Sequence, residues 1–240
     1  MSAQPVQQSG ADEAVLALIP AYNEARHIEA VVRTAQIYLP VLVVDDGSVD
    51  DTAARAQQAG AAVLVQHPNQ GKGAALKAGF RQAISENRRA VLTLDADGQH
   101  DPAEIPAFLD AYHKDGYDLI LGERDFGKIP IVRRISNTIG RITFSWSLGR
   151  QVGDNQTGYR LISRRLMQAM LESPEQGFQF EVEMIVVCVL NGFSLGTVPI
   201  RTIYAGESSH IQPLRHIVEF FRMVYQTRRR VRQAGGATNK

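Results

Sequence analysis

The sequence is poor in cysteine and has no long uninterrupted apolar segment. Its 240 residues include a single cysteine, Cys188, which excludes an intramolecular disulfide and favours a reducing, cytoplasmic setting. Nowhere do about 18 uncharged apolar residues follow one another, as a membrane-spanning helix requires. The net charge of +1 is too small to indicate a protein that binds nucleic acid. These absences leave a globular domain with no membrane-spanning helix and no charge excess that would indicate binding to nucleic acid.

The composition that remains is that of an ordinary globular protein. The chain is 44% hydrophobic and 21% charged, and at this length it can bury a core without disulfides or a structural metal. Residues 1–13 have no basic region followed by an apolar stretch, so we expect a loose tail there and not a signal peptide or anchor. We expect one domain over residues 14–210, followed by an amphipathic basic helix and tail over 211–240.

Short apolar runs rich in β-branched residues recur in the first half of the chain. Without polar alternation, such runs predict strands that are buried on both faces. They lie at 15–20, 41–46, 62–66, 90–95 and 119–123. Helical patterns occupy 24–39, 51–59 and 73–87, and further helices are expected at 160–172 and 180–192. This alternation predicts an α/β fold with a mostly parallel central sheet and helices on both faces.

Each conspicuous polar cluster in the first half directly follows one of these strands. The clusters are PAYNE (20–24), DDGSVDD (45–51), NQGKG (69–73) and DADGQHD (95–101). Any one of them taken alone is typical of a turn rich in Asp, Asn and Gly. The carboxyl ends of parallel strands share one edge of a sheet, so the four clusters together indicate a binding site at that edge.

The last cluster places Asp95, Asp97 and Asp101 close together with no lysine or arginine among them. Such carboxylates cost free energy unless a cation or hydrogen-bond donors compensate them. Mg²⁺ or Mn²⁺ is a natural answer, because these ions take one or two carboxylates and fill their other positions with water and phosphate oxygens. A calcium loop starting at Asp95 is excluded, since its twelfth position is Pro106. Asp101 precedes a proline and is expected to begin the next helix.

Arginines after the fifth predicted strand indicate phosphate binding, although a solvated basic surface is the alternative reading. Arg124 directly follows that strand, and Arg133 and Arg134 come shortly after; guanidinium groups bind phosphate in a bidentate manner. A P-loop is not indicated, because Lys72 is followed by Gly73 where that motif requires a hydroxyl. The dinucleotide-binding GxGxxG pattern is missing after the first strand as well.

In this order the motifs resemble those of family 2 glycosyltransferases with the GT-A fold, most closely the dolichol- or polyprenyl-phosphate mannosyltransferase-like branch. They are IPAYNE (19–24), VVDDGSVDDT (43–52), NQGKGAAL (69–76), LDADGQHDP (94–102), LGER (121–124) and TGYR (157–160). The resemblance implies a metal-dependent enzyme that transfers a hexosyl group, with inversion, from GDP- or UDP-hexose to a polyprenyl phosphate.

The resemblance also implies roles for individual residues. The nucleotide of the donor would lie against Pro20, Tyr22 and Glu24, and Val44 and Asp46 would hold its base. The rest of the donor site would be formed by Asp95, Ala96, Asp97, Gln99 and Arg124. Of these residues, Asp95, Asp97 and Gln99 are the implied ligands of Mg²⁺ or Mn²⁺. The residues implied to act in the transfer itself are Asp97, Arg124, Arg133 and Asp154, with Ser136 or Asn137 near the acceptor phosphate.

The acceptor is left open by the sequence. A phosphate monoester is already anionic and needs no strong base, whereas a sugar hydroxyl would need a carboxylate such as Asp154, which could instead cap the following segment. Ser209 stands where the resembled branch carries a lysine, and Arg201 or His210 is a possible substitute. A regulator that binds nucleotide sugar without catalysis is a further alternative.

The segment 213–232 combines apolar residues with arginines and is predicted to form a helix. Such a helix would place a basic, apolar surface against the anionic cytoplasmic face of a membrane, where a lipid-linked acceptor resides. The alternative is an ordinary terminal helix docked on the core. The sequence does not determine the oligomeric state.

Overall fold

The computed structural model describes residues 14–124, 142–155, 157–175, 177, 179–201 and 224–233. The strands are β1 (Val15–Ala21), β2 (Val41–Asp45), β3 (Ala62–Val65), β4 (Ala90–Thr93), β5 (Leu119–Arg124), β6 (Arg160–Ser163) and β7 (Leu195–Ile200). The helices are α1 (Ile28–Ala35), α2 (Thr52–Gln58), α3 (Lys72–Ser85), the short 3-10 helix η2 (Pro102–Glu104), α4 (Ile105–Asp115), α6 (Arg164–Leu171) and α7 (Phe180–Leu190). Residues 142–148 and 224–233 are helical as well.

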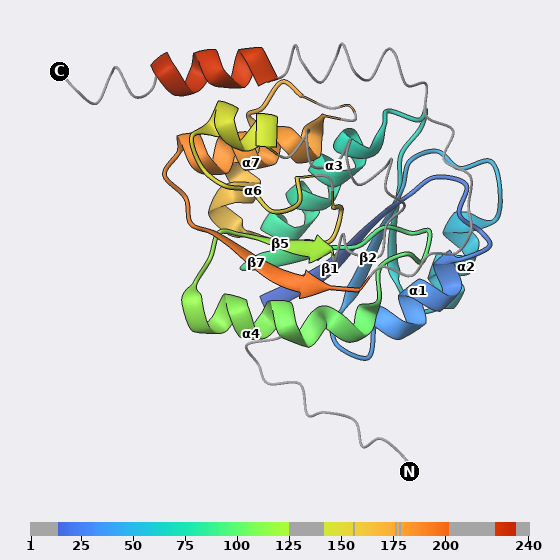
Figure 1. The fold of residues 1–240 in the computed structure, drawn as a ribbon. Coiled ribbons are helices and arrows are strands. Elements are labelled where there is room, and N and C mark those ends of the chain that lie inside the picture. The colour runs from blue at the N-terminus through green and yellow to red at the C-terminus, as the bar shows by residue number, and fades with distance from the viewer. Residues whose placement is uncertain are drawn as a thin grey trace, which may run out of the picture.

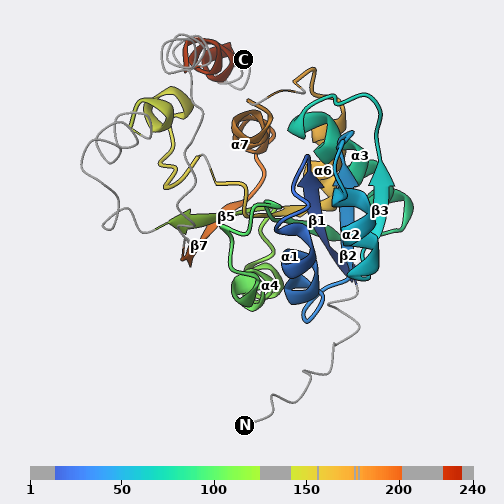
Figure 2. The same ribbon diagram turned by 90° about the vertical axis from the view of Figure 1, so that its right-hand side faces the viewer.

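The strands form one mixed sheet in the order β3-β2-β1-β4-β6-β5-β7 (Figures 1 and 2). Four of its strand pairs are parallel, namely β1 with β2, β1 with β4, β2 with β3 and β5 with β7. β6 runs antiparallel between β4 and β5. The predicted α/β fold with a mostly parallel sheet is therefore confirmed.

Helices cover both faces of the sheet, as predicted. Residues of α3, α6 and α7 pack with one face in the first hydrophobic cluster, and residues of α1, α2 and α4 pack with the other face in the second. Figure 1 shows α4 below the sheet and α6 and α7 above it. The sheet therefore lies between two apolar layers. Polar binding sites can form where the loops meet at the ends of the strands.

Two sequence predictions about strands are wrong. Residues 160–163 form β6, an inner strand between β4 and β5, and not the start of a helix. Successive side chains of a strand point to opposite faces. Leu161 and Ile162 accordingly enter different hydrophobic clusters. Ser163 then caps α6, accepting a hydrogen bond from the Leu166 amide at 3.3 Å.

The second wrong prediction concerns β3, which is not buried on both faces, since it is an edge strand whose Val65 is 47% exposed. β7 was not predicted, because its inner and outer residues alternate and the sequence shows no continuous apolar run.

The described part of the C-terminal helix, residues 224–233, docks on the core along one face. Val224 and Thr227 are buried, and Arg230 forms an ion pair with Glu183 of α7 at 2.8 Å. Tyr225 lies on the other side and is 72% exposed. Within the described residues, no helix is long and apolar enough to cross a membrane. The predicted N-terminal tail and residues 211–223 lie outside the described residues.

Asp118, just before β5, makes a buried polar contact that fixes how β5, β6 and β7 meet. It accepts hydrogen bonds from the Ser163 hydroxyl at 2.9 Å and the Ser194 amide at 2.8 Å, and it forms an ion pair with Arg165. Burial alone would raise the pKa of Asp118, but Arg165 and the serine donors lower it to about 2. The charged form is therefore the one that the folded protein stabilises.

We expect Asp118→Asn to lower the free energy of unfolding by about 2 to 3 kcal/mol at neutral pH. A depressed folded-state pKa gives stability that is present above the unfolded pKa of about 4 and is lost as pH falls toward 2. The variant should therefore lose part of the acid dependence of urea unfolding between pH 4 and 2. Asp110→Asn, on the exposed side of α4, is the matched control. An unchanged acid dependence in Asp118→Asn would contradict this account.

Candidate functional site

A cavity of about 360 Å³ lies at the carboxyl ends of the parallel strands. It draws on all four polar clusters that follow β1, β2, β3 and β4. Its lining residues are Pro20, Ala21, Tyr22, Glu24, Asp46, Asn69, Gly71, Lys72, Ala75, Asp95, Ala96 and Asp97. The prediction that these clusters meet at one edge of the sheet is confirmed.

The loops after β2 and β3 are joined through Asp46. Its carboxylate accepts hydrogen bonds from the amides of Gln70 at 2.9 Å and Gly71 at 2.7 Å. Asp46 lines the cavity, and its contact with the base of a nucleotide stays a prediction. Val44 has a fully buried side chain in the core and is not among the lining residues, so its side chain does not reach a ligand there.

The carboxylate of Asp95 is compensated by a cation from another loop. Lys72 Nζ lies 2.5 Å from Asp95 Oδ1 and 3.0 Å from Glu181 Oε1. On the other side, His100 Nδ1 accepts the Asp95 amide hydrogen at 3.1 Å, and His100 Nε2 lies 3.7 Å from Asp95 Oδ2. Burial would raise the pKa of Asp95, but Lys72 and His100 bring it well below its usual range. Asp95 is therefore ionised at neutral pH.

Lys72 is held in its charged form by the same contacts. Burial would lower the pKa of Lys72, but the carboxylates of Asp95 and Glu181 raise it above its ordinary value. The side chain is still 39% exposed and lines the cavity. A fixed positive charge therefore lines the cavity beside Asp95.

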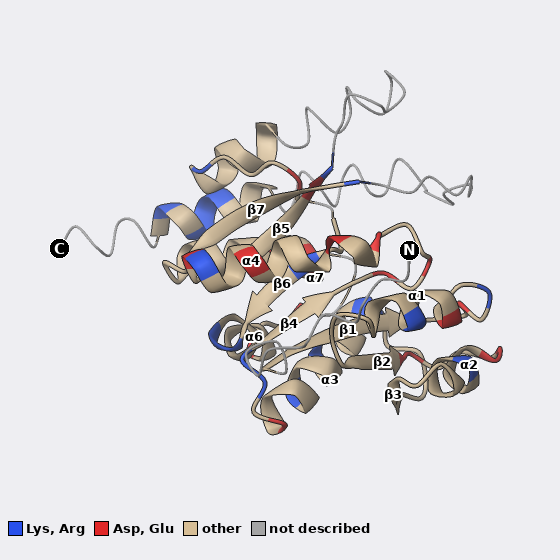
Figure 3. Ribbon diagram, turned by 90° about the horizontal axis from the view of Figure 1, so that it is seen from below, with Lys and Arg blue, Asp and Glu red and all other residues tan. Residues whose placement is uncertain are grey.

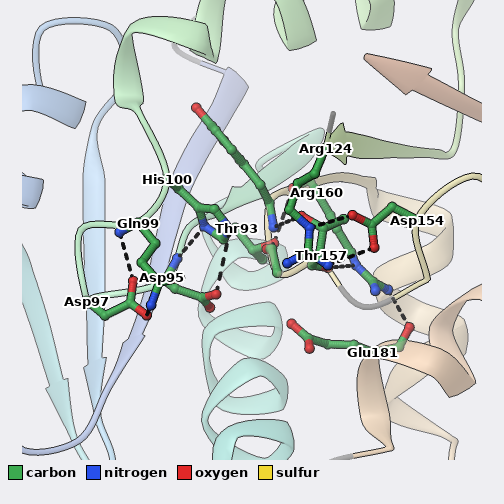
Figure 4. Close-up of polar contacts among 12 residues, drawn as sticks. Thr93, Asp95, Asp97, Gln99, His100, Arg124, Asp154, Thr157, Arg160 and Glu181 are labelled. Atoms are coloured by element: carbon green, nitrogen blue, oxygen red, sulfur yellow. Dashed lines mark hydrogen bonds and ion pairs between the residues drawn. The ribbon is translucent and has the colours of Figure 1, made fainter. Parts of the chain in front are cut away.

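Gly158 makes room for Asp95 beneath the cavity. A Cβ atom at this position would lie 2.6 Å from Asp95 Oδ1 and 2.7 Å from Oδ2, which is closer than atoms can approach. The Gly158 carbonyl accepts a hydrogen bond from the Thr93 hydroxyl at 2.7 Å. This fixes the segment TGYR against the end of β4 (Figure 4).

Asp97 is oriented by Gln99 (Figure 4). The amide of Gln99 donates to Asp97 Oδ1 at 2.9 Å, and its side-chain Nε2 donates to Oδ2 at 3.0 Å. Gln99 itself is not among the residues that line the cavity. Asp101 behaves as expected: it caps η2, its Oδ1 accepting from the Ala103 amide at 3.0 Å. The cluster thus divides into two cavity carboxylates and one helix cap.

The oxygen donors at this edge fit a hard divalent ion. Among the described residues, no three His, Cys, Asp or Glu side chains converge as a complete metal site. Asp95 and Asp97 both line the cavity and leave most coordination positions to a ligand, which is how Mg²⁺ is commonly held beside phosphates. Ligation by Asp95, Asp97 and Gln99 stays a prediction.

Arg124 and Asp154 form a bidentate ion pair beside this site (Figure 4). Arg124 Nε lies 2.6 Å from Asp154 Oδ2, and Nη2 lies 3.0 Å from Oδ1. The Asp154 side chain is 2% exposed, whereas that of Arg124 is 25% exposed. Neither residue lines the cavity described above. Arg133, Ser136 and Asn137, predicted at the acceptor phosphate, lie outside the described residues, as do Ser209 and His210.

Arg160 at the start of β6 is a buried cation behind the site. Its Nε donates to the Thr157 carbonyl at 2.7 Å and its Nη2 to the Asn155 carbonyl at 3.2 Å, and its Nη1 donates to the Glu181 carbonyl. Burial lowers the pKa of Arg160, and the nearby carboxylates oppose that shift. Arg160 thereby ties β6, the loop carrying Asp154 and the start of α7 together.

Four charged or polar residues at the site were not predicted from the sequence, namely Lys72, His100, Arg160 and Glu181. Lys72 belongs to the NQGKG cluster, which was correctly predicted to lie at the carboxyl ends of the strands. Its place in the site could therefore have been predicted from that cluster. Its partner Glu181 lies more than a hundred residues away in an apolar helix, and no local pattern links the two.

Comparisons with known proteins, by sequence and by structure, agree on the class of protein that this chain resembles. The family model described as "Glycosyl transferase family 2" matches residues 17–171. The polyprenol monophosphomannose synthase of Mycolicibacterium smegmatis is 32% identical over 77% of this chain and 76% of its own. The UDP-N-acetylglucosamine–dolichyl-phosphate N-acetylglucosaminyltransferase of Methanococcus voltae is 28% identical over 81% of this chain and 87% of its own.

Among solved structures, the glucosyl-3-phosphoglycerate synthase of Mycobacterium tuberculosis, in complex with Mn²⁺, UDP-glucose and phosphoglyceric acid, has a similar fold. The TM-score is 0.68 at 20% identity, over 95% of this chain and 83% of that one. At this identity the likeness establishes the GT-A fold alone.

Proposed function

The chain belongs to glycosyl transferase family 2, and we propose that it transfers a hexosyl group, with inversion, from a nucleotide-diphosphate sugar to a polyprenyl phosphate. The observation that carries the proposal is the cavity in which Asp95, Asp97 and the Lys72 ammonium face the same space. The names of the lipid-phosphate glycosyltransferase relatives support the acceptor class.

We assign the donor to this cavity. Pro20, Tyr22 and Glu24 line one side of it and would contact the nucleotide, as would Asp46 on the loop after β2. Mg²⁺ or Mn²⁺ held by Asp95 and Asp97 would neutralise charge on the departing diphosphate. Lys72 adds a fixed cation of this chain at the same place and would bind the diphosphate directly.

Arg124 is the described residue that we assign to the acceptor phosphate. Asp154 holds its guanidinium in one orientation through two hydrogen bonds, which fixes the direction in which the remaining N–H donors of Arg124 can meet a phosphate. The alternative, transfer to a hydroxyl with Asp154 as base, has less support because both carboxylate oxygens already accept from Arg124. A non-catalytic regulator would have no need of the paired charges around Asp95.

A screen of nucleotide sugars tests the function. Purified protein with Mn²⁺ is incubated with GDP- and UDP-hexoses, with and without a polyprenyl phosphate, and both release of nucleoside diphosphate and formation of glycolipid are measured. We expect release to depend on the lipid phosphate and the product to have inverted anomeric configuration by NMR. Efficient transfer to a free sugar hydroxyl, with no response to polyprenyl phosphate, would overturn the acceptor assignment.

We propose that the helices 142–148 and 224–233 together meet the membrane surface. Arg228 joins the two helices. Its Cζ lies 4.8 Å from the centroid of the Trp146 ring, and its Nη1 donates a hydrogen bond to the backbone carbonyl of Trp146 at 3.2 Å. Three large apolar side chains are exposed there, Ile142, Trp146 and Tyr225, beside the exposed Arg229 and Arg232. Aromatic and basic groups together favour an anionic lipid surface.

We expect Arg229→Glu to weaken binding to vesicles with anionic lipid by about tenfold, since each basic residue near such a surface contributes about 1 kcal/mol. Co-sedimentation with phosphatidylglycerol vesicles at two salt concentrations measures the effect. Arg55→Glu, exposed on α2, is the matched charge control and should bind as the wild type does. Equal loss in both variants would show that only net charge matters and would contradict a docking surface.

A further inference from the structure

A second cavity, of about 460 Å³, lies at the opposite end of β4 from the donor cavity, next to the first residue of that strand. The short strand β6 connects the two regions. Arg160 at its start pairs with Thr93, two residues before Asp95, and Ser163 at its end pairs with Ala90 and lines the second cavity. The end of α4, the residue before β4 and the first turn of α6 complete the walls. This cavity has no part in the function proposed above.

Its lining carries an excess of positive charge. Arg89, Arg164 and Arg165 line the cavity, with Asp118 as the acidic residue among its lining. Arg165 is paired with Asp118, so these two charges compensate each other. Throughout the described ranges, no carboxylate lies within ion-pair distance of Arg89 or Arg164. Two guanidinium charges therefore remain.

The two remaining arginines are presented differently. Arg164 is anchored: its Nη1 donates to the Arg88 carbonyl at 3.2 Å and its Nη2 to the Ile84 carbonyl at 3.0 Å, contacts that fix the guanidinium without removing its charge. Arg89 is exposed and is attached to the fold by its backbone amide, which donates to the Ala14 carbonyl at 2.7 Å. Figure 3 shows basic segments gathered beside α6.

Aromatic side chains form the rest of the wall. Tyr117 packs over Gly196, where a Cβ atom would lie 2.6 Å from its ring, so the ring is fixed in place. Tyr112 is half-buried, and burial raises the pKa of its hydroxyl, which stays protonated and able to donate. The ring of His113 lies 5.6 Å from that of Tyr112. The cavity thus combines two cations, a hydroxyl donor and planar apolar faces.

We propose that this cavity binds a small phosphomonoester, with its phosphate against Arg89 and Arg164 and its organic part against Tyr112 and Tyr117. Guanidinium groups are the preferred partners of a phosphate dianion, and the volume is within the range of small-molecule sites. The tyrosine faces favour a ligand with an aromatic or sugar ring over bare phosphate.

Phenyl phosphate is the test probe, titrated into the ¹⁵N-labelled full chain and followed by residue-resolved NMR. We expect shift changes at the amides of Ser163, Arg164 and Tyr117, and affinity at least fivefold tighter than that of inorganic phosphate. Arg89→Ala should weaken binding about tenfold, because a charge-assisted contact is lost while the backbone bond of residue 89 is kept. Arg81→Ala, exposed on α3, is the control and should bind as the wild type does.

Three outcomes would overturn the proposal. Shift changes confined to the donor cavity would show that phosphate binds only there. Unchanged affinity in Arg89→Ala would remove the arginine contact, and equal affinity for phenyl phosphate and inorganic phosphate would remove the organic part of the ligand. Because the readout is local to each cavity, failure here leaves the transferase assay unaffected, and the reverse also holds.

Discussion

Asp97→Ala is expected to reduce sugar transfer by about three orders of magnitude while leaving the fold intact. The Asp97 carboxylate lines the donor cavity and is held by two hydrogen bonds from Gln99, so it is pre-organised for a ligand. Its side chain is not part of either hydrophobic cluster, so its removal leaves the core packing unchanged. Transfer rates with Mn²⁺ and Mn²⁺ binding by electron paramagnetic resonance should both fall.

Asp101→Asn is the matched control, because it changes a carboxylate of the same cluster that caps η2 and does not line the cavity. Asparagine is as good a cap as aspartate, so both stability and Mn²⁺ binding should stay near wild type. Wild-type Mn²⁺ affinity in Asp97→Ala would show that the ion is held elsewhere and would remove the predicted role of this carboxylate.

The second large effect is expected at a residue that has no side chain. Gly158→Ala would place a methyl group 2.6 Å from Asp95 Oδ1, so the carboxylate would have to leave its position between Lys72 and His100. We expect donor turnover to fall at least a hundredfold and the free energy of unfolding to fall by about 1 to 3 kcal/mol.

A double-mutant cycle separates this clash from a general effect on the backbone. In an Asp95→Ala background the carboxylate is gone, so adding Gly158→Ala should cost little further stability. Urea unfolding of the four proteins measures the coupling. Equal destabilisation by Gly158→Ala in both backgrounds would show that the glycine serves its own backbone and not Asp95.

The sequence predicted what depends on local pattern. Apolar runs placed five strands close to where they lie, and the rule that parallel strands end at one edge brought Tyr22, Asp46 and Asp95 to one cavity. The cap at Asp101 followed from its proline neighbour. These features depend on neighbours along the chain, which a sequence displays directly.

What the sequence did not predict depends on contacts across the fold. The Lys72 ammonium is fixed by Asp95 and by Glu181, residues that no periodicity relates to it. β6 was mistaken for the start of a helix because its four residues continue into a strong helical pattern, and only burial on two faces distinguishes it. Arg133, and Ser209 at the position where the resembled branch carries a lysine, lie outside the described residues, so the predictions about them are not tested.

The register of β6 also limits how this chain can change in length. Adding or removing one residue there would reverse the faces to which Leu161 and Ile162 point. The same change would separate Arg160 from the carbonyls that it joins, or Ser163 from the helix that it caps. We therefore expect that insertions and deletions within these four residues will not be tolerated, whether in evolution or in engineering. The edge strand β3 should tolerate them better.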